Sequence, residues 1–597
     1  MRLPQTGLAN WAIGAAALAA SVPLAWLLSR FESSFPDPER RVMATAVIFL
    51  LLLVAPPAAY LLKRRRAAEP RQAALLLLVA ATVLMCGAWL YSTLPAILFP
   101  ADILIWSESD FVNDIIKFRV GYPLYTDERN NESFIYPPAA QLATYALAWL
   151  ARRPTSIPAY RIIQVCFVLA AVGLAAACCR RLARISGVAH HPPGLWPALS
   201  LPVLFLAATN PLTNPFTHNL HNDALALLVC AASCYVLLSY VASRGRGWLW
   251  AMIFLPGLGF AVKQSLLVWL PLFVLYLVVF DQPRSWTRVL AVLVAGSGFA
   301  AALIAGGYLL WGEPFRYWVL TVLGERGASP LRGFRHLLAI SPYVGAGLVG
   351  AWALLRGAAL PALLGPWLIW LLLTLVEIYT SGIAWMMNHI GPGSLLALVW
   401  FLVALQRLWP GLLPGTPKRS TWLGWFRAAL VTVGLLLLFG GMGFIRVPLP
   451  AIPRQAYDYV AQIERRFQTA PARSVLLDVG SWVYLPQGVV MRDRAPCMGD
   501  RGYSQTGDFS GILERIERRH YAKILIRRLH SPDFWYDHFL WHKPSGIRRK
   551  LLEHYEEVER IPAGWQTQPT ETPPYLFDEI SVLAPKPRSV PPGYDRR

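Results

Sequence analysis

Three acidic side chains follow one another closely in a charged and aromatic stretch, residues 106–138, that interrupts a long apolar sequence. They are Glu108, Asp110 and Asp114. If this part of the stretch is helical, Asp110 and Asp114 share one face with Lys117, while Glu108 points elsewhere. Asp114 and Lys117 are therefore candidate substrate-binding residues that support Asp110. A carboxylate that stays ionised within reach of an acceptor hydroxyl can act as a general base. The spacing fits solvated residues of a polar loop equally well.

The same stretch continues into a segment rich in tyrosine and proline. Tyrosine offers a flat apolar ring and a polar hydroxyl, which suit a surface that contacts both apolar and polar groups. Tyr122, Tyr125 and Tyr136 are therefore candidate walls of a substrate-binding site.

A second polar segment, NPLTNPFTHNLHND at 210–223, supplies His218, His221 and Asp223. Histidine with carboxylate can hold a divalent metal or bind a phosphate, so His221 and Asp223 are candidate metal ligands. The alternative is structural, because Asn219 or Asn222 could simply cap the following helix.

Lys263 stands between two apolar halves in GFAVKQSLL and is followed by Gln264. A lysine so close to hydrocarbon is costly unless it reaches an anion or the interface, which makes it a candidate for binding substrate. The alternative is that it extends to the lipid headgroups. A third polar segment, 379–393, brings Asn388 and His389 to the start of an apolar run as further candidate substrate-binding residues.

The composition places these residues in a membrane protein. The chain of 597 residues is 55% hydrophobic and only 15% charged, which excludes an ordinary soluble protein. Its basic residues cluster beside apolar runs, as the positive-inside rule predicts, so the net charge of +21 does not indicate nucleic acid.

Apolar runs of about twenty residues, the length that crosses about 30 Å of hydrocarbon, recur along the chain. They predict about thirteen spans, near 10–29, 43–62, 73–98, 160–179, 193–209, 222–243, 247–262, 265–281, 287–311, 336–355, 359–379, 391–406 and 421–444. Lysine and arginines at 63–66 assign that loop to the cytoplasm. The N-terminus is then cytoplasmic, and the candidate residues and the C-terminal segment are outside.

Tyr136–Leu150 is apolar but only about fifteen residues long, and a span there would move Arg180 and Arg181 to the outer side. It is therefore predicted to lie at the outer interface. The expected fold is mainly α: a polytopic transmembrane helical bundle, 1–444, whose outer catalytic loop with the interfacial helix occupies 100–152.

From about residue 445 the composition becomes polar, and strand-like runs at 474–479 and 522–529 alternate with helix-like runs at 508–519 and 547–559. This pattern predicts a C-terminal extramembrane α/β domain at 445–597, placed in the periplasm or outside the cell.

ESDF, then GYPLY, then YPP resembles the first outer loop of the GT-C superfamily of polytopic glycosyltransferases. That superfamily includes aminoarabinose transferases of lipid A and protein O-mannosyltransferases. LHNDALALL and AVKQSLLVWLP also look like later segments of bacterial members. The resemblance covers most of 100–400 and departs from the aminoarabinose branch in having ESD where that branch has a DE pair.

The resemblance implies that Asp110 is the catalytic base, with Glu108 as its rival, and that Lys263 binds the donor's phosphate. His221 and Asp223 would form the polar cluster near it. The implied protein is a bacterial inner-membrane enzyme that moves a sugar from a polyprenyl-phosphate donor to a hydroxyl of a glycan, lipid or protein acceptor, with inversion. A divalent metal is a possible cofactor, and a nucleotide cofactor is not expected because no GxGxxG or P-loop follows a strand.

Two other functions fit a polytopic chain with charged residues: a transporter or flippase of a lipid-linked saccharide, and a glycan polymerase or ligase of the same fold. A transporter usually shows internal repeats and ionisable residues near the midplane. This sequence has no repeated half, and its charged residues gather at the predicted outer face. Both features favour the interpretation as a transferase.

Overall fold

The structure of the chain is a computed structural model. It describes residues 70–105, 107–188, 195–325, 327–356, 360–383, 387–413, 422–445, 452–478, 480–493, 508–527, 529–530, 546–562 and 579–587. Contacts divide the chain into two compact units. Unit 1 holds residues 1–99, 142–305 and 327–451, and unit 2 holds 100–141, 306–326 and 452–597. Unit 2 is therefore assembled from three separate stretches of sequence.

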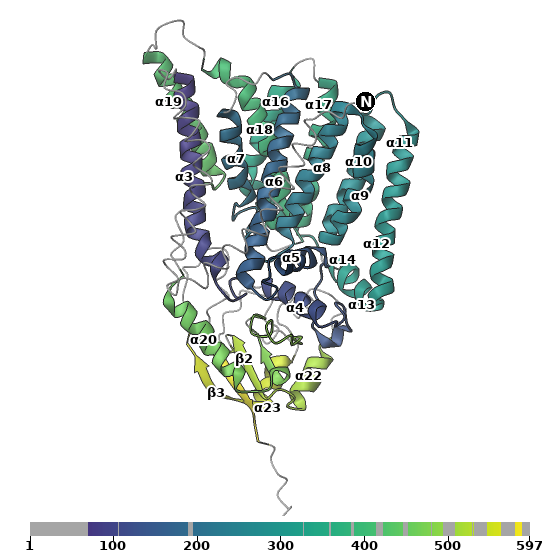
Figure 1. Cartoon of the computed structure of the whole chain (residues 1–597), viewed down its shortest axis with the longest axis vertical. Helices are drawn as coiled ribbons and strands as arrows, with labels where there is room; N and C mark the ends of the chain where they lie inside the picture. Colours follow the sequence, from purple (N-terminus) through teal and green to yellow (C-terminus); the bar gives the residue numbers. More distant parts are fainter. Residues whose placement is uncertain are drawn as a thin grey trace, which may run out of the picture. The chain divides into compact units, whose positions relative to one another are not determined.

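Helices make up the described part of unit 1, most of them apolar, and Figure 1 shows several of them running alongside one another. They are α3 (Pro70–Leu98), α6 (Ile157–Ile185), α7 (Leu195–Ala208), α8 (Asp223–Ser243), α9 (Arg246–Val262), α10 (Trp269–Val279), α11 (Trp286–Leu290), α12 (Gly296–Trp311), α15 (Pro330–Ala339), α16 (Ser341–Leu355), α17 (Leu360–Ser381), α18 (Gly391–Leu412) and α19 (Trp422–Gly441). Helix α12 extends into unit 2.

The core of unit 1 lies where α6 packs against α8 and where α16 packs against α18. Both faces of α6 are apolar, and most of its residues are buried. On α16, a Cβ at Gly350 would lie 2.7 Å from the backbone carbon of Trp400. Glycine there lets the two helix backbones approach closely.

The predicted spans agree with the helices. The first two, near 10–29 and 43–62, lie outside the described residues, and each of the other eleven coincides with a helix or a helix pair. Seven helices of the described chain are long and apolar enough to cross a membrane, or eight if the bent pair α15–α16 is one span. The apolar helices at 195–208, 246–262 and 264–279 are shorter than the 18 residues taken as the minimum for a span. The chain is a multi-pass membrane protein.

The predicted interfacial segment contains helix α5 (Ala139–Leu150). Its 12 residues extend over roughly 18 Å, too short to cross the hydrocarbon. The helix is confirmed, and its place at the outer interface stays a prediction.

Unit 2 contains helix α4 (Glu108–Arg119) of the acidic stretch, the short helices α13 (Glu313–Arg316) and α14 (Val322–Gly324), and an α/β domain. That domain has helices α20 (Arg454–Gln468), α22 (Ser510–Glu517) and α23 (Ile547–His554). Its four strands are β1 (Val475–Leu477), β2 (Lys523–Arg527), β3 (Tyr555–Ile561) and β4 (Ile580–Pro585), in the order β1-β2-β4-β3. β1 and β2 are parallel, and the other two pairings are antiparallel.

The small α/β domain predicted from the sequence is confirmed, with one correction. The run at 547–559 was predicted to be helical throughout, but α23 ends at His554 and β3 begins at Tyr555. Glutamate and arginine in this run favour a helix. Pairing of β3 with β4, and burial of Tyr555 and Ile561 at its two ends, override that local preference.

Candidate functional site

The acidic stretch forms helix α4 as predicted, but its carboxylates are not solvated. Acidic residues occupy the first turn and basic residues the last, an order that the helix dipole favours. Glu108, Asp110 and Asp114 are all buried, with Asp110 only 2% exposed. The loop alternative for these residues is therefore wrong. Glu108 and Asp110 share the helix's first turn.

Asp114 and Lys117 meet, but the structure gives them a supporting role. The ammonium of Lys117 lies 3.5 Å from Asp114 Oδ1, and Gln141 donates to Asp114 Oδ2 at 3.0 Å. Lys117 is fully buried and also donates to the carbonyl oxygens of Leu124 and Glu132. Its ammonium thus ties α4 to the loop that follows it, so its predicted contact with substrate has no support in this arrangement.

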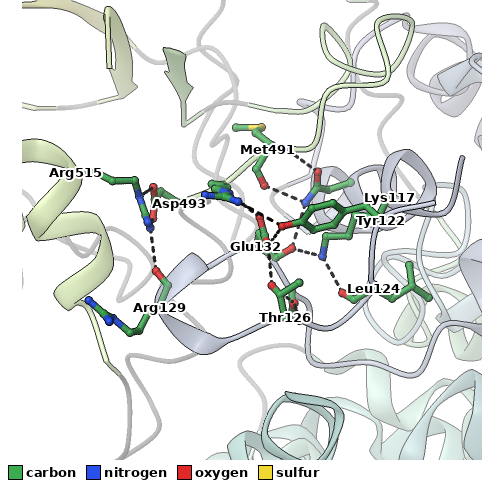
Figure 2. Close-up of polar contacts among 12 residues, drawn as sticks. Lys117, Tyr122, Leu124, Thr126, Arg129, Glu132, Met491, Asp493 and Arg515 are labelled. Carbon is green, nitrogen blue, oxygen red and sulfur yellow. Dashed lines mark hydrogen bonds and ion pairs between the residues drawn. The ribbon is translucent and has the colours of Figure 1, made fainter. Parts of the chain in front are cut away.

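Figure 2 shows the network around Glu132, which sequence reasoning missed. One carboxylate oxygen of Glu132 accepts from the Tyr122 hydroxyl at 2.8 Å and from Thr126 Oγ1 at 2.7 Å. The other lies 3.3 Å from Nε of Arg492. Burial, and then the charge of Glu132, raise the pKa of Tyr122, which keeps its hydroxyl protonated as a donor.

The three candidate tyrosines lie in different surroundings. Tyr122 and Tyr136 are half-buried, and the ring of Tyr136 stacks on Phe111 at 6.0 Å. Tyr125 is buried, donates to the carbonyl of Tyr136 at 2.6 Å and contacts the rings of Trp311 and Phe315. Tyr122 and Tyr136 remain the accessible wall candidates, while Tyr125 belongs to an aromatic core.

Segment 480–493 of the α/β domain holds α4 and the chain before it. The Asp102 carboxylate accepts from the backbone N–H groups of Ser481 and Trp482, at 2.9 and 3.2 Å. Asn113 donates to the Met491 carbonyl at 3.2 Å and accepts from its N–H at 3.1 Å. These are backbone contacts across more than 370 positions, so no residue pattern in the sequence reveals them.

A further clamp joins the loop after α4 to helix α22. Arg515 pairs with Asp493 through two hydrogen bonds of 2.7 and 2.6 Å, and it also donates to the carbonyl of Arg129 at 2.9 Å (Figure 2). Such bidentate, charge-assisted pairs fix orientation well. The acidic helix and its loop are built into the α/β domain.

A second polar cluster lies within unit 1. Lys263 donates to Asp223 Oδ1 at 2.7 Å, and Asn388 donates to Asp223 Oδ2 at 2.9 Å. His221 Nδ1 lies 3.3 Å from the same Oδ2. All four side chains are buried. The structure thus places His221 and Asp223 beside Lys263, as the resemblance implies, and adds Asn388 to the same cluster.

The local fold explains how Lys263 reaches Asp223. Helix α9 ends at Val262, and Lys263 adopts an extended backbone conformation before a short 3-10 turn begins at Gln264. Asp223 is the first residue of α8, after Asn222 at the N-cap position. The Asn222 side chain makes no cap hydrogen bond and instead donates to the Val262 carbonyl at 3.4 Å. The capping alternative for Asn222 is therefore wrong.

A pocket opens beside this cluster. Its polar lining is Asn214, Asp223, Lys263, Ser265, Glu377, Thr380, Asn388 and His389, and its apolar lining includes Leu266, Val268 and Leu373. His389 is half-buried there, and Gln264 is half-buried but is not part of the lining. Sequence reasoning missed Asn214 and Glu377. Glu377 could have been found, because a carboxylate inside an apolar run is itself a signal of function.

The cluster does not fit the metal site proposed for His221 and Asp223. Both oxygens of Asp223 are engaged, one by the Lys263 ammonium and the other by Asn388 and His221. Among the residues that the structure describes, no group of three His, Cys, Asp or Glu side chains could hold a metal. The positive charge beside Asp223 is that of lysine.

Residues 197–311, which include Asp223 and Lys263, match the family model described as dolichyl-phosphate-mannose-protein mannosyltransferase. No curated protein matches the chain. Among solved structures, the chain is similar to the oligosaccharyltransferase of Archaeoglobus fulgidus in its apo form, with 10% identity and a TM-score of 0.43 over 76% of this chain and 69% of that one. The same enzyme in complex with Zn and sulfate gives a TM-score of 0.42 at 10% identity, over 76% of this chain and 68% of that one.

The two structural likenesses are too distant to transfer a site. The family-model match concerns residues 197–311, the segment that carries Asp223 and Lys263, and that segment is similar to a family of mannosyltransferases. This similarity agrees with the resemblance to polytopic glycosyltransferases seen in the sequence motifs.

Proposed function

We propose that the protein transfers a sugar from a polyprenyl-monophosphate donor to an acceptor hydroxyl at the outer face of the inner membrane. The observation that carries this proposal is the ammonium of Lys263, which pairs with Asp223 at the wall of a pocket; both residues lie in the family-matched segment. Asn388 donates to the other oxygen of Asp223. A buried cation beside a pocket in an apolar bundle suits an anionic group attached to a lipid.

Asp110 is the proposed general base. It would take the proton of the acceptor hydroxyl, whose oxygen then attacks the anomeric carbon and forms the new glycosidic bond. The bond between that carbon and the phosphate oxygen breaks, the configuration inverts, and polyprenyl monophosphate leaves. The position of Asp110 in the first turn of α4 supports this role, because a helix N-terminus stabilises an ionised carboxylate.

Lys263 would stabilise the charge that develops on the departing phosphate. Asn388 and His389, both in the pocket lining, would contact the donor, and Gln264 follows Lys263 at the helix break. Tyr122 and Tyr136 are the proposed sugar or lipid walls. The donor carries its own phosphate, so the reaction as proposed uses no nucleotide.

The proposed orientation has the N-terminus in the cytoplasm and the α/β domain on the outer side. It follows from the basic residues at 63–66 and the positive-inside rule. The acceptor is a glycan, a lipid or a protein.

The base assignment is tested by Asp110→Asn, with Glu108→Gln as the matched variant two residues away. Asp110→Asn should retain its fold and bind donor lipid but lose transfer by a factor of about 100 or more, the usual contribution of a general base. The measurement is transfer of labelled sugar from a purified polyprenyl-phosphate donor in detergent. Full activity in Asp110→Asn with activity lost only in Glu108→Gln would make Glu108 the base.

A further inference from the structure

A buried carboxylate joins two helix connections at one end of unit 1. Asp281 follows α10, is only 2% exposed and accepts from the Tyr240 hydroxyl at 2.6 Å. Arg288 of α11 donates to the same carboxylate at 3.2 Å, and Arg244, which follows α8, lies 3.4 Å from its other oxygen. The connection between α8 and α9 is thereby fixed beside the connection between α10 and α11.

Four arginines gather on these two connections: Arg244, Arg246, Arg284 and Arg288, which we name the arginine patch. Asp281 is the only acidic residue between positions 224 and 312, so the patch and this carboxylate together carry a net charge of +3. Arg244, Arg246 and Arg284 are exposed, and Arg288 is half-buried. Ion pairs with the buried Asp281 orient the guanidinium groups of Arg244 and Arg288, while Arg246 and Arg284 add charge beside them.

The backbone at Arg244 gives an independent indication that its side chain matters. This residue ends α8 in the left-handed conformation, with φ 49°. Glycine occupies such a position without strain, whereas a residue with a side chain is disfavoured there. An arginine at this point is explained by its guanidinium contact with Asp281 and not by the turn.

Exposed aromatic rings flank the arginine patch. Trp250, one turn beyond Arg246 on α9, is 59% exposed and stacks on Phe254, and Trp286 at the start of α11 is 58% exposed. The guanidinium of Arg284 lies 5.5 Å from the centre of the Trp286 ring. Tryptophan beside arginine at helix ends is typical of the membrane–water interface. This combination predicts that the patch lies at the level of lipid headgroups.

We propose that the arginine patch binds the phosphate of an anionic phospholipid, with the acyl chains lying against Trp250 and Trp286. Guanidinium groups match phosphate oxygens in pairs, and basic pockets between transmembrane helices take anionic headgroups. The charge bias predicts this end of the bundle to be cytoplasmic, where anionic lipids are concentrated. The inference does not depend on sugar transfer.

The test uses the purified full chain in neutral detergent, titrated with phosphatidylglycerol, with phosphatidylcholine or with glycerol phosphate. Bound lipid is counted by native mass spectrometry, and the affinity of each lipid is taken from the titration. Phosphatidylglycerol should bind at least tenfold more tightly than phosphatidylcholine. The double variant Arg246→Gln/Arg284→Gln, which leaves the Asp281 network intact, should lower its affinity by roughly tenfold to thirtyfold.

The matched control removes two exposed arginines of the α/β domain, Arg518→Gln/Arg549→Gln, and should leave lipid binding unchanged. Equal binding of the two phospholipids would overturn the proposal, and so would an equal loss in the control. Glycerol phosphate that binds as tightly as the lipid would show a site for a soluble anion instead. The comparison of lipids on the unaltered chain decides the question even if the double variant fails to fold.

Discussion

Lys263 and Asp223 form a buried ion pair, and this fact governs what a substitution of either residue does. Lys263→Ala would leave the Asp223 carboxylate buried without its cation, and breaking a buried pair in this way costs about 3–5 kcal/mol. We expect Lys263→Met combined with Asp223→Asn to recover most of that stability but not sugar transfer. Unfolding in detergent and transfer activity are measured side by side for the single and double variants.

Lys550→Ala is the matched control, since the partner of Lys550 is Glu517 on an exposed surface. It should cost far less stability than Lys263→Ala, because water screens an ion pair at the surface. If Lys263→Ala were no more destabilising than this control, the buried pair would not contribute as described. Recovered transfer in the double variant would remove Lys263 from the chemistry and leave it a structural role.

Individual functional residues were the feature of this molecule that the sequence predicted best. Lys263 and Asp110 could be found because a charge in an apolar chain is conspicuous, and the same rule would have found Glu377. Their partners could not. That Asp223 neutralises Lys263 depends on a helix that breaks at 263 beside one that starts at 223, and neither position follows from hydropathy. The sequence therefore suggests a metal site at His221 and Asp223, where the structure has an ion pair between Asp223 and Lys263.

The side chain of Asn113 positions helix α4 through hydrogen bonds to backbone groups of other segments. Asn113 bonds both the N–H and the carbonyl of Met491 and also donates to the Glu132 carbonyl at 3.2 Å. Asn113→Asp keeps the shape but loses both donated bonds. The Glu132 carbonyl keeps its bond from Lys117, whereas losing the donor to the buried Met491 carbonyl costs about 1–3 kcal/mol. We expect faster hydrogen exchange across Glu108–Arg119 and lower turnover with an unchanged KM for donor, measured by mass spectrometry and steady-state kinetics.

Asn130→Asp is a suitable control for that variant. Asn130 lies half-buried in the loop that follows α4, and among the hydrogen bonds that the structure describes it contacts Asp493 only through its backbone carbonyl, so the substitution leaves that bond in place. It should leave the exchange of α4 unchanged. Faster exchange confined to the α/β sheet in Asn113→Asp would show a folding defect of that domain, contradicting a role in positioning α4.

At the scale of the whole molecule, the order of elements could be predicted and their grouping could not. Hydropathy predicts each described span, and the change of composition near 445 predicts the α/β domain. The sequence suggested an outer loop that belongs to the membrane part. Contacts group residues 100–141 and 306–326 with 452–597 instead, because Asp102 and Asn113 bond the backbone of a segment far along the chain.

This grouping predicts what happens when the chain is cut between the two units. A protease site inserted near residue 448 would separate 452–597 covalently from the rest, yet that fragment should still co-elute with the membrane part in size exclusion. The contacts with residues 100–141 that hold it include buried hydrogen bonds, so 0.5 M salt should not release it. Asp102→Ala combined with Asn113→Leu should release it after cleavage, because the Asp102 bonds to Ser481 and Trp482 and the Asn113 bonds to Met491 are lost together. A fragment that dissociates from the unaltered, cleaved chain would contradict the division into these units.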